Sequence, residues 1–102
     1  MATWHAVLPL AELAEGLTEV EVAGDVLLLV RRGDAVTACA ALCPHKFTAL
    51  AGGTLEDGCL TCPQHEASFD LGTGKPRPGQ EWAGMLPLHA VRIHEGVVQI
   101  QL

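Results

Sequence analysis

The sequence predicts an all-β protein built from antiparallel strands. Turn dipeptides recur between short segments rich in Val, Leu, Ile and Thr: Gly24-Asp25, Gly33-Asp34, Asp57-Gly58 and Glu95-Gly96. Such dipeptides favour the tight turns of β-hairpins. The segments between them either alternate apolar and polar residues or are continuously apolar over the length of a strand.

Strands are predicted on both sides of a central, turn-rich region. Before it, residues 9–16 suit one helical turn, Thr18 to Val22 alternates as a half-buried strand, and Val26 to Val30 is apolar on both faces, as in a central strand. After it, His89 to His94 places Val and Ile on one face, and Val98 to Leu102 alternates with glutamines to close the chain.

The central region, residues 43–82, is rich in Gly, Pro and Thr and is predicted to be a small insert between the base strands. Within it, Asp57-Gly58 predicts a hairpin that pairs residues 54–56 with residues 59–62. We find no repeat and no long linker, so the 102 residues are expected to form one domain, 1–102. The protein is also expected to be a monomer.

Composition excludes several classes of function. Twelve acidic and six basic residues give a net charge of −6, which argues against nucleic acid or anionic membrane as a partner. The chain has no apolar run of membrane-spanning length and no basic residue before an apolar N-terminal segment. We therefore expect a cytoplasmic protein without a membrane anchor.

Two short cassettes carry the chemistry: Cys43-Pro44-His45 and Cys62-Pro63-Gln64-His65. Two thiolates and two imidazoles at this spacing suit an iron-sulfur cluster with one sulfur-ligated and one histidine-ligated iron. The hypothesis is that Cys43 and Cys62 bind one iron while His45 and His65 bind the other. Because imidazole is the weaker donor, the histidine-ligated iron would receive the electron.

A competing interpretation uses the four cysteines, Cys39, Cys43, Cys59 and Cys62, as a tetrahedral zinc site in an interaction module. The pair Cys59 and Cys62 does have the spacing of a zinc ribbon. The interpretation leaves both histidines of the matched cassettes unexplained.

The paired cassettes, each with Pro after the cysteine, resemble the cluster-binding signature of Rieske [2Fe–2S] proteins. The similarity continues through the segment from Ser68 to Lys75, which is similar to the same region of soluble Rieske ferredoxins. The resemblance implies a β-sandwich base with a smaller cluster-binding subdomain. It also implies one [2Fe–2S] cluster per chain, with its histidine edge near the tip of the molecule.

Neighbouring residues indicate which branch of that family the chain resembles. Respiratory members carry a disulfide at positions that correspond to Thr48 and Gln64, and hydroxyl donors at those of Ala67 and Phe69. This chain has neither, so Cys39 and Cys59 are expected to be small buried apolar residues. Without hydroxyl donors to the cluster sulfurs, the resemblance implies a low potential, about −150 mV.

The resemblance implies a one-electron carrier rather than an enzyme. A flavin-dependent reductase would be its transient donor, and a terminal oxygenase, either an aromatic-ring dioxygenase or a di-iron monooxygenase, its transient acceptor. The alternative is a Rieske-like small subunit of a nitrite reductase. The expected docking surface comprises Lys46, Phe47, Glu66, Pro76, Pro78 and Trp82.

Overall fold

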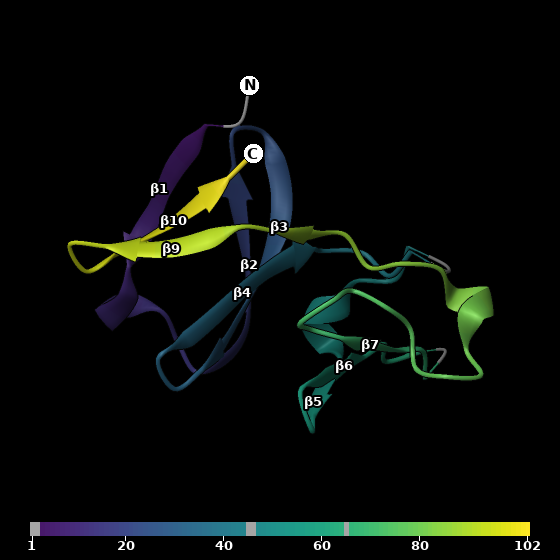
Figure 1. Cartoon of the computed structure of the whole chain (residues 1–102). Coiled ribbons are helices and arrows are strands. Elements are labelled where there is room, and N and C mark those ends of the chain that lie inside the picture. Colours follow the sequence, from purple (N-terminus) through teal and green to yellow (C-terminus); the bar gives the residue numbers. More distant parts are fainter. Residues whose placement is uncertain (1–2, 45–46, 65) are drawn as a thin grey trace. The chain divides into compact units, whose positions relative to one another are not determined.

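The computed structural model describes residues 3–44, 47–64 and 66–102, and its regular structure there consists of β-strands and short 3-10 helices. The strands form three sheets (Figure 1), and the registers of their paired strands are antiparallel. The prediction of an all-β antiparallel fold is confirmed. Within the described ranges, no helix is both long enough and apolar enough to span a bilayer.

The chain divides into two compact units, the first comprising Met1–Cys39 and His89–Leu102 and the second comprising Ala40–Leu88. The first unit holds two sheets, with strand orders β1-β10-β9 and β2-β3-β4-β8. Strands β4 and β8 run across the boundary into the second unit. The elements are β1 (Trp4–Pro9), η1 (Leu10–Glu12), β2 (Gly16–Val22), β3 (Asp25–Arg32), β4 (Ala35–Ala40), β8 (Leu88–His89), β9 (Val91–His94) and β10 (Val97–Gln101).

The central position of β3 follows from its apolar sequence. Leu27 and Leu29 pack into the core cluster, whose other members come from β2, β4, β10 and the segment after η1. Leu28 and Val30, which alternate with them, are also fully buried. Burial on both faces is typical of a central strand, and β3 lies between β2 and β4, as predicted.

The first predicted turn is displaced by one residue. Strands β2 and β3 pair Val22 with Asp25, so the two-residue loop is Ala23-Gly24 rather than Gly24-Asp25. Both loop residues have positive φ, 51° and 88°, as a type I′ turn requires. Glycine at the second central position fits that turn, which explains why Asp25 joins the strand.

The predicted strand from His89 to His94 is divided between two sheets. Its first residue ends β8, beside β4, whereas β9 begins after Ala90 and pairs with β10. Val91 is half-buried, but Ile93, expected on the same apolar face, is 41% exposed. Since β9 is an edge strand, less of its apolar face is covered.

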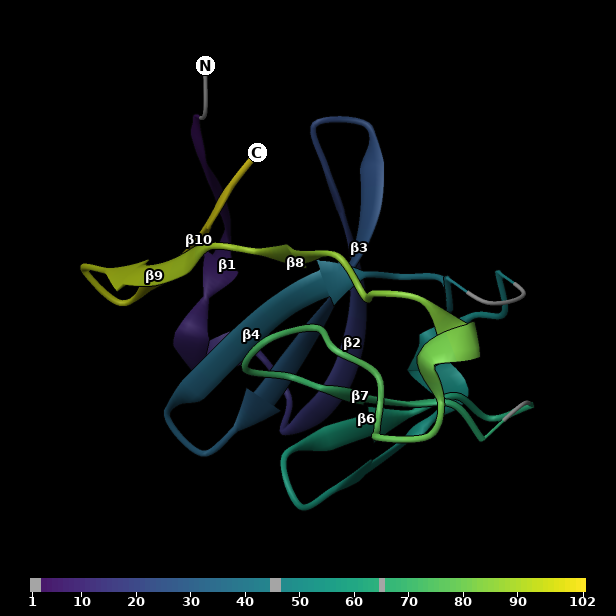
Figure 2. The same ribbon diagram turned by 45° about the vertical axis from the view of Figure 1, so that its right-hand side comes forward.

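The second unit is built on a small sheet of order β5-β6-β7, part of which is seen in Figure 2. The Asp57-Gly58 turn joins β5 to β6 with positive φ at both residues, which confirms the predicted hairpin. A further bridge, between Phe69 and Pro76, adds the following segment to the edge of β7. The elements are η2 (Leu50–Gly52), β5 (Thr54–Glu56), β6 (Cys59–Thr61), β7 (Ser68–Asp70) and η3 (Glu81–Ala83).

Gly74 closes this unit by bringing two backbone segments together. Its N–H donates to the carbonyl of Asp70 at 2.7 Å, and its carbonyl accepts from the N–H of Leu86 at 2.8 Å. Its φ is 78°, and a Cβ added there would lie 2.3 Å from the carbonyl oxygen of Leu86. A side chain at this position is therefore excluded by sterics as well as disfavoured by backbone conformation.

Substituting Gly74 by alanine should lower the free energy of unfolding by about 3 kcal/mol or more, because left-handed strain and a backbone clash add. Gly24→Ala is the matched control: its φ is 88°, but a Cβ there meets nothing within 4 Å. That control should cost only about 1 to 2 kcal/mol. Chemical denaturation of both variants measures the difference, and equal losses would contradict the close approach at Gly74.

Candidate metal centre

The two cassettes begin loops that have the same backbone closure. The first ligand loop is defined as residues 43–48 and the second as residues 62–67. The N–H of Cys43 donates to the carbonyl of Thr48 at 2.7 Å, and the N–H of Cys62 donates to that of Ala67 at 2.8 Å. The residues immediately outside also pair, as a Leu42 to Ala49 bridge and a Thr61 to Ser68 rung.

Both loops also turn at equivalent residues. Phe47 and Glu66, each four positions after the cysteine, have φ of 57° and 56°. Side chains other than glycine pay roughly 1 to 2 kcal/mol for this left-handed conformation. The cost is met twice at matching positions, so the rest of each loop must hold these residues there.

The structure describes half of the predicted ligand set. Cys43 and Cys62 are buried, at 0% and 1% exposure, at the first residue of each loop. His45, His65 and the predicted docking residue Lys46 lie outside the described residues. The described donors suit a cluster iron chemically, because two buried thiols at equivalent loop positions can supply two thiolates to one metal.

A side-chain hydrogen bond joins the two ligand loops. The hydroxyl of Thr48 donates to the side-chain oxygen of Gln64 at 3.2 Å. By the resemblance to Rieske proteins, these are the two positions at which respiratory members would carry a disulfide. In this chain a polar contact links the loops at the same two positions.

The cysteines outside the cassettes differ from each other. Cys39, in β4, is fully buried, as expected of a small apolar residue, and desolvation by burial raises the pKa of its thiol to about 12. Cys59, in β6, is only half-buried, so the expectation of burial is met in part. None of the four cysteines forms a disulfide.

The zinc alternative gains no support. All four cysteines lie in the described ranges, and there no three Cys, His, Asp or Glu side chains are grouped so that they could hold a metal ion. His45 and His65 are not among the described residues, so this statement does not include them.

The residues after the second cassette leave few hydroxyls beside it. Ala67 and Phe69 are fully buried and carry no donor. Ser68, between them, is also buried, and its hydroxyl lies 2.7 Å from that of Thr61 on the neighbouring strand. The hydroxyls of Thr61 and Ser68 therefore contact each other within the sheet.

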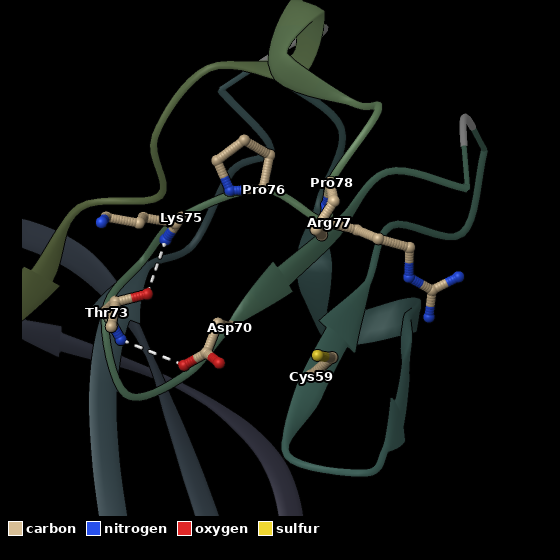
Figure 3. A pocket seen from close by; sticks show the side chains of 7 residues that line it. All are labelled: Cys59, Asp70, Thr73, Lys75, Pro76, Arg77 and Pro78. Atoms are coloured by element: carbon tan, nitrogen blue, oxygen red, sulfur yellow. Dashed lines mark hydrogen bonds between the residues drawn. The ribbon is translucent and has the colours of Figure 1, made fainter.

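A shallow hollow lies against β6 and β7 (Figure 3). Cys59 and Asp70 line it from the sheet, while the prolines at 76 and 78 line it from the segment that follows. The side chains of Lys75 and Arg77 extend in opposite directions there. Because the two cationic groups do not converge, the hollow lacks the paired charges of an anion site.

Apolar side chains of the predicted docking surface are exposed. Phe47 is 71% exposed and Trp82 is 53% exposed, whereas packing of these rings into a core would have hidden them. Glu66 and Pro78 are exposed as well, and Pro76 is half-buried. Met85, which the sequence did not suggest, is 53% exposed in the same unit.

Sequence reasoning missed Gln80. Its side-chain amide accepts a hydrogen bond from the N–H of Ser68 at 2.8 Å and donates to the carbonyl of Glu66 at 3.2 Å. The signal that could have found it is the Pro78-Gly79 dipeptide, which predicts a type II turn. Such a turn brings Gln80, its last residue, close to Arg77, its first.

Comparison with known proteins agrees with these features. The Rieske [2Fe-2S] domain family matches residues 3–85. The ferredoxin subunit of anthranilate 1,2-dioxygenase from Burkholderia cepacia is 34% identical over all of this chain and 94% of that protein.

Solved structures share the fold. The ferredoxin of carbazole 1,9a-dioxygenase from Nocardioides aromaticivorans IC177 is 29% identical with a TM-score of 0.84, covering 96% of each chain. A structure of reduced oxygenase with oxidized ferredoxin in carbazole 1,9a-dioxygenase matches at 27% identity and a TM-score of 0.83, over 95% of this chain and 91% of that one. A nitrite reductase small subunit described from Mycobacterium tuberculosis has a TM-score of 0.87 over 100% of this chain and 96% of that one, but at 20% identity it shows the fold alone.

The raised pKa of Cys39 makes stability depend on alkaline pH. Above pH 9.0 the thiol ionises in the unfolded chain but stays protonated in the folded one up to about pH 12. The unfolded state therefore binds fewer protons, and the free energy of unfolding falls as pH rises, by up to about 1.4 kcal/mol for each pH unit.

Urea denaturation between about pH 8.5 and about pH 11, which spans the range where the unfolded thiol ionises, tests this against Cys39→Ala. The variant loses a constant amount of stability from its smaller side chain, but it should show a shallower decline with pH than the wild type. Parallel curves would contradict the burial of an ionisable thiol at this position.

Proposed function

The chain belongs to the Rieske [2Fe-2S] domain family, and on that basis we propose that it is the ferredoxin of an oxygenase system, a one-electron carrier rather than a catalyst. The observation that carries this proposal is the pair of equivalent ligand loops, each beginning with a buried cysteine. The similarity to dioxygenase ferredoxins along nearly their whole length supports it. Residues 1–102 form one Rieske domain in this proposal, with residues 43–82 as the cluster-binding insert.

Cys43 and Cys62 bind one iron of the cluster, and His45 and His65 bind the other. When bound, the cluster accepts and releases a single electron, held mainly on the histidine-ligated iron. The loops keep both thiols out of water. The donor set described above, two buried thiols at matching positions, supports this assignment.

The potential of the cluster is low. Hydrogen bonds to the sulfurs stabilise the extra negative charge of the reduced form and raise the potential. Ala67 and Phe69 supply no hydroxyl, and the hydroxyl of Ser68 lies beside Thr61. Reduction therefore gains little from side-chain donors.

The carrier meets its partners through an apolar surface near the ligand loops. This surface comprises Lys46, Phe47, Glu66, Pro76, Pro78 and Trp82. Its exposed aromatic rings provide the contact area of a small, transient interface. The net charge of −6 steers the protein toward a basic partner.

The acceptor is a terminal oxygenase, as in the complex of the carbazole dioxygenase components. The donor is a flavin-dependent reductase. Four cysteines without disulfides suit the reducing cytoplasm, where we place the protein as a monomer. The nitrite reductase alternative rests on shared fold only and is not favoured.

Spectroscopy of the dithionite-reduced protein tests the ligand set and the potential together. Mixed histidine and cysteine ligation should give an EPR signal whose average g-value is lower than that of four-cysteine clusters. Redox titration should give a midpoint of about −150 mV, since side-chain hydroxyl donors are lacking. A four-cysteine signal would refute the ligand assignment, and a midpoint above about +100 mV would refute the low-potential one.

Truncating the exposed aromatic residues tests the docking surface. Trp82→Ala and Phe47→Ala should each lower kcat/KM for reduction of the terminal oxygenase about tenfold, because buried aromatic anchors dominate such interfaces. The midpoint potential should not change. Ile93→Ala, which removes an exposed apolar side chain from the first unit, is the control.

Ionic strength provides a second measurement in the same assay. Electron transfer to the oxygenase should slow as salt screens the steering charge.

If Trp82→Ala and Phe47→Ala behave like Ile93→Ala, the interface lies elsewhere on the protein.

A further inference from the structure

A turn after β7 brings Gln80 back to the end of this strand. The carbonyl of Arg77 accepts a hydrogen bond from the N–H of Gln80 at 2.9 Å, which closes a turn with Pro78 and Gly79 at its centre. Gly79 has φ of 92°, as the third residue of a type II turn requires. The side chain of Gln80 then reaches two backbone groups of the neighbouring segment.

Gln80 replaces a backbone partner in the ladder on β7. The N–H of Asp70 donates to Lys75, and the N–H of Arg77 donates to Ser68, both at 2.8 Å. In a regular antiparallel ladder, Ser68 would in turn donate to the carbonyl of Arg77. That carbonyl instead accepts from the backbone of Gln80, and Ser68 donates to the Oε1 of Gln80 at 2.8 Å.

The NH2 group of the same side chain contacts the second ligand loop. The Nε2 of Gln80 donates to the carbonyl of Glu66 at 3.2 Å, so the amide spans Ala67. On its other edge, Ala67 accepts the hydrogen bond of Cys62 that closes the loop. The backbone of Ala67 is thus held between the proposed ligand Cys62 and the side chain of Gln80.

We propose that Gln80 is a positioning residue for the second ligand loop. Its amide fixes the return of the loop and keeps Glu66 in its left-handed conformation, beside His65 in the sequence. The structural part of this inference stands on the hydrogen bonds alone, whereas its consequence for the cluster rests on the proposed function.

The cost of losing this amide follows from burial. Ser68 is 2% exposed, so removing the acceptor leaves its N–H without the partner that Gln80 provides. The carbonyl of Glu66 loses its donor at the same time. Without these two hydrogen bonds, residues 66–68 lose their contact with Gln80, and the second ligand loop can open more often.

The test compares holoprotein variants. Gln80→Leu removes both hydrogen bonds, and Gln80→Glu keeps the acceptor for Ser68 but not the donor for Glu66. Gln101→Leu makes the same chemical change in the first unit and serves as the control. The measurements are hydrogen exchange at the Ser68 amide, the rate of cluster loss, and the width of the reduced EPR signal.

Gln80→Leu should exchange the Ser68 amide about tenfold faster, lose the cluster about tenfold faster, and broaden the EPR lines because the loop samples several positions. Gln80→Glu should restore slow exchange at Ser68 while cluster loss stays fast, and it keeps the test informative if Gln80→Leu does not fold. If the wild type gives the mixed-ligand EPR signal and Gln80→Leu equals Gln101→Leu in amide exchange, cluster loss and line width, the role of Gln80 is overturned. A wild type without the mixed-ligand signal refutes the proposed function instead, and exchange at Ser68 still reports on the hydrogen bonds.

Discussion

The hydrogen bond from each cassette cysteine to the carbonyl five residues later is the interaction on which the second unit depends. It closes each ligand loop on itself, so backbone pairing helps to fix a cysteine whose side chain is also buried. The outer rungs, Leu42 with Ala49 and Thr61 with Ser68, anchor the loops to the surrounding structure. These closures help to hold Phe47 and Glu66 in left-handed conformations, to which the hydrogen bond from Phe47 to Cys43 and the Gln80 amide also contribute.

The sequence predicts much of this arrangement because its signals are local. Turn dipeptides and alternation locate the hairpins, and the spacing of ligand residues in the cassettes indicates the metal chemistry. The split of residues 89–94 between two sheets is not predictable in this way, since their alternation is the same whichever sheet they join. Nor does any residue type signal the left-handed turns at Phe47 and Glu66, because neither is glycine or asparagine.

Gln80 illustrates a different limit of sequence reasoning. A turn sequence predicts where the backbone reverses, but not that a side chain at its end will take over a ladder position from a backbone carbonyl. That exchange arises because the turn already uses the carbonyl of Arg77, which leaves Ser68 in need of another acceptor. The Pro78-Gly79 turn points to this position, but the accounting of donors and acceptors in the folded chain identifies the exchange.

The two ends of the second unit are far apart in the sequence but lie on adjacent strands. It starts in β4 and finishes in β8, adjacent strands of one sheet, and the N–H of Ala40 donates to the carbonyl of Pro87 at 3.0 Å. A segment whose two ends meet in this way occupies the position of a hairpin loop, however long it is. A change in the length of residues 41–86 therefore need not alter the register of the flanking strands.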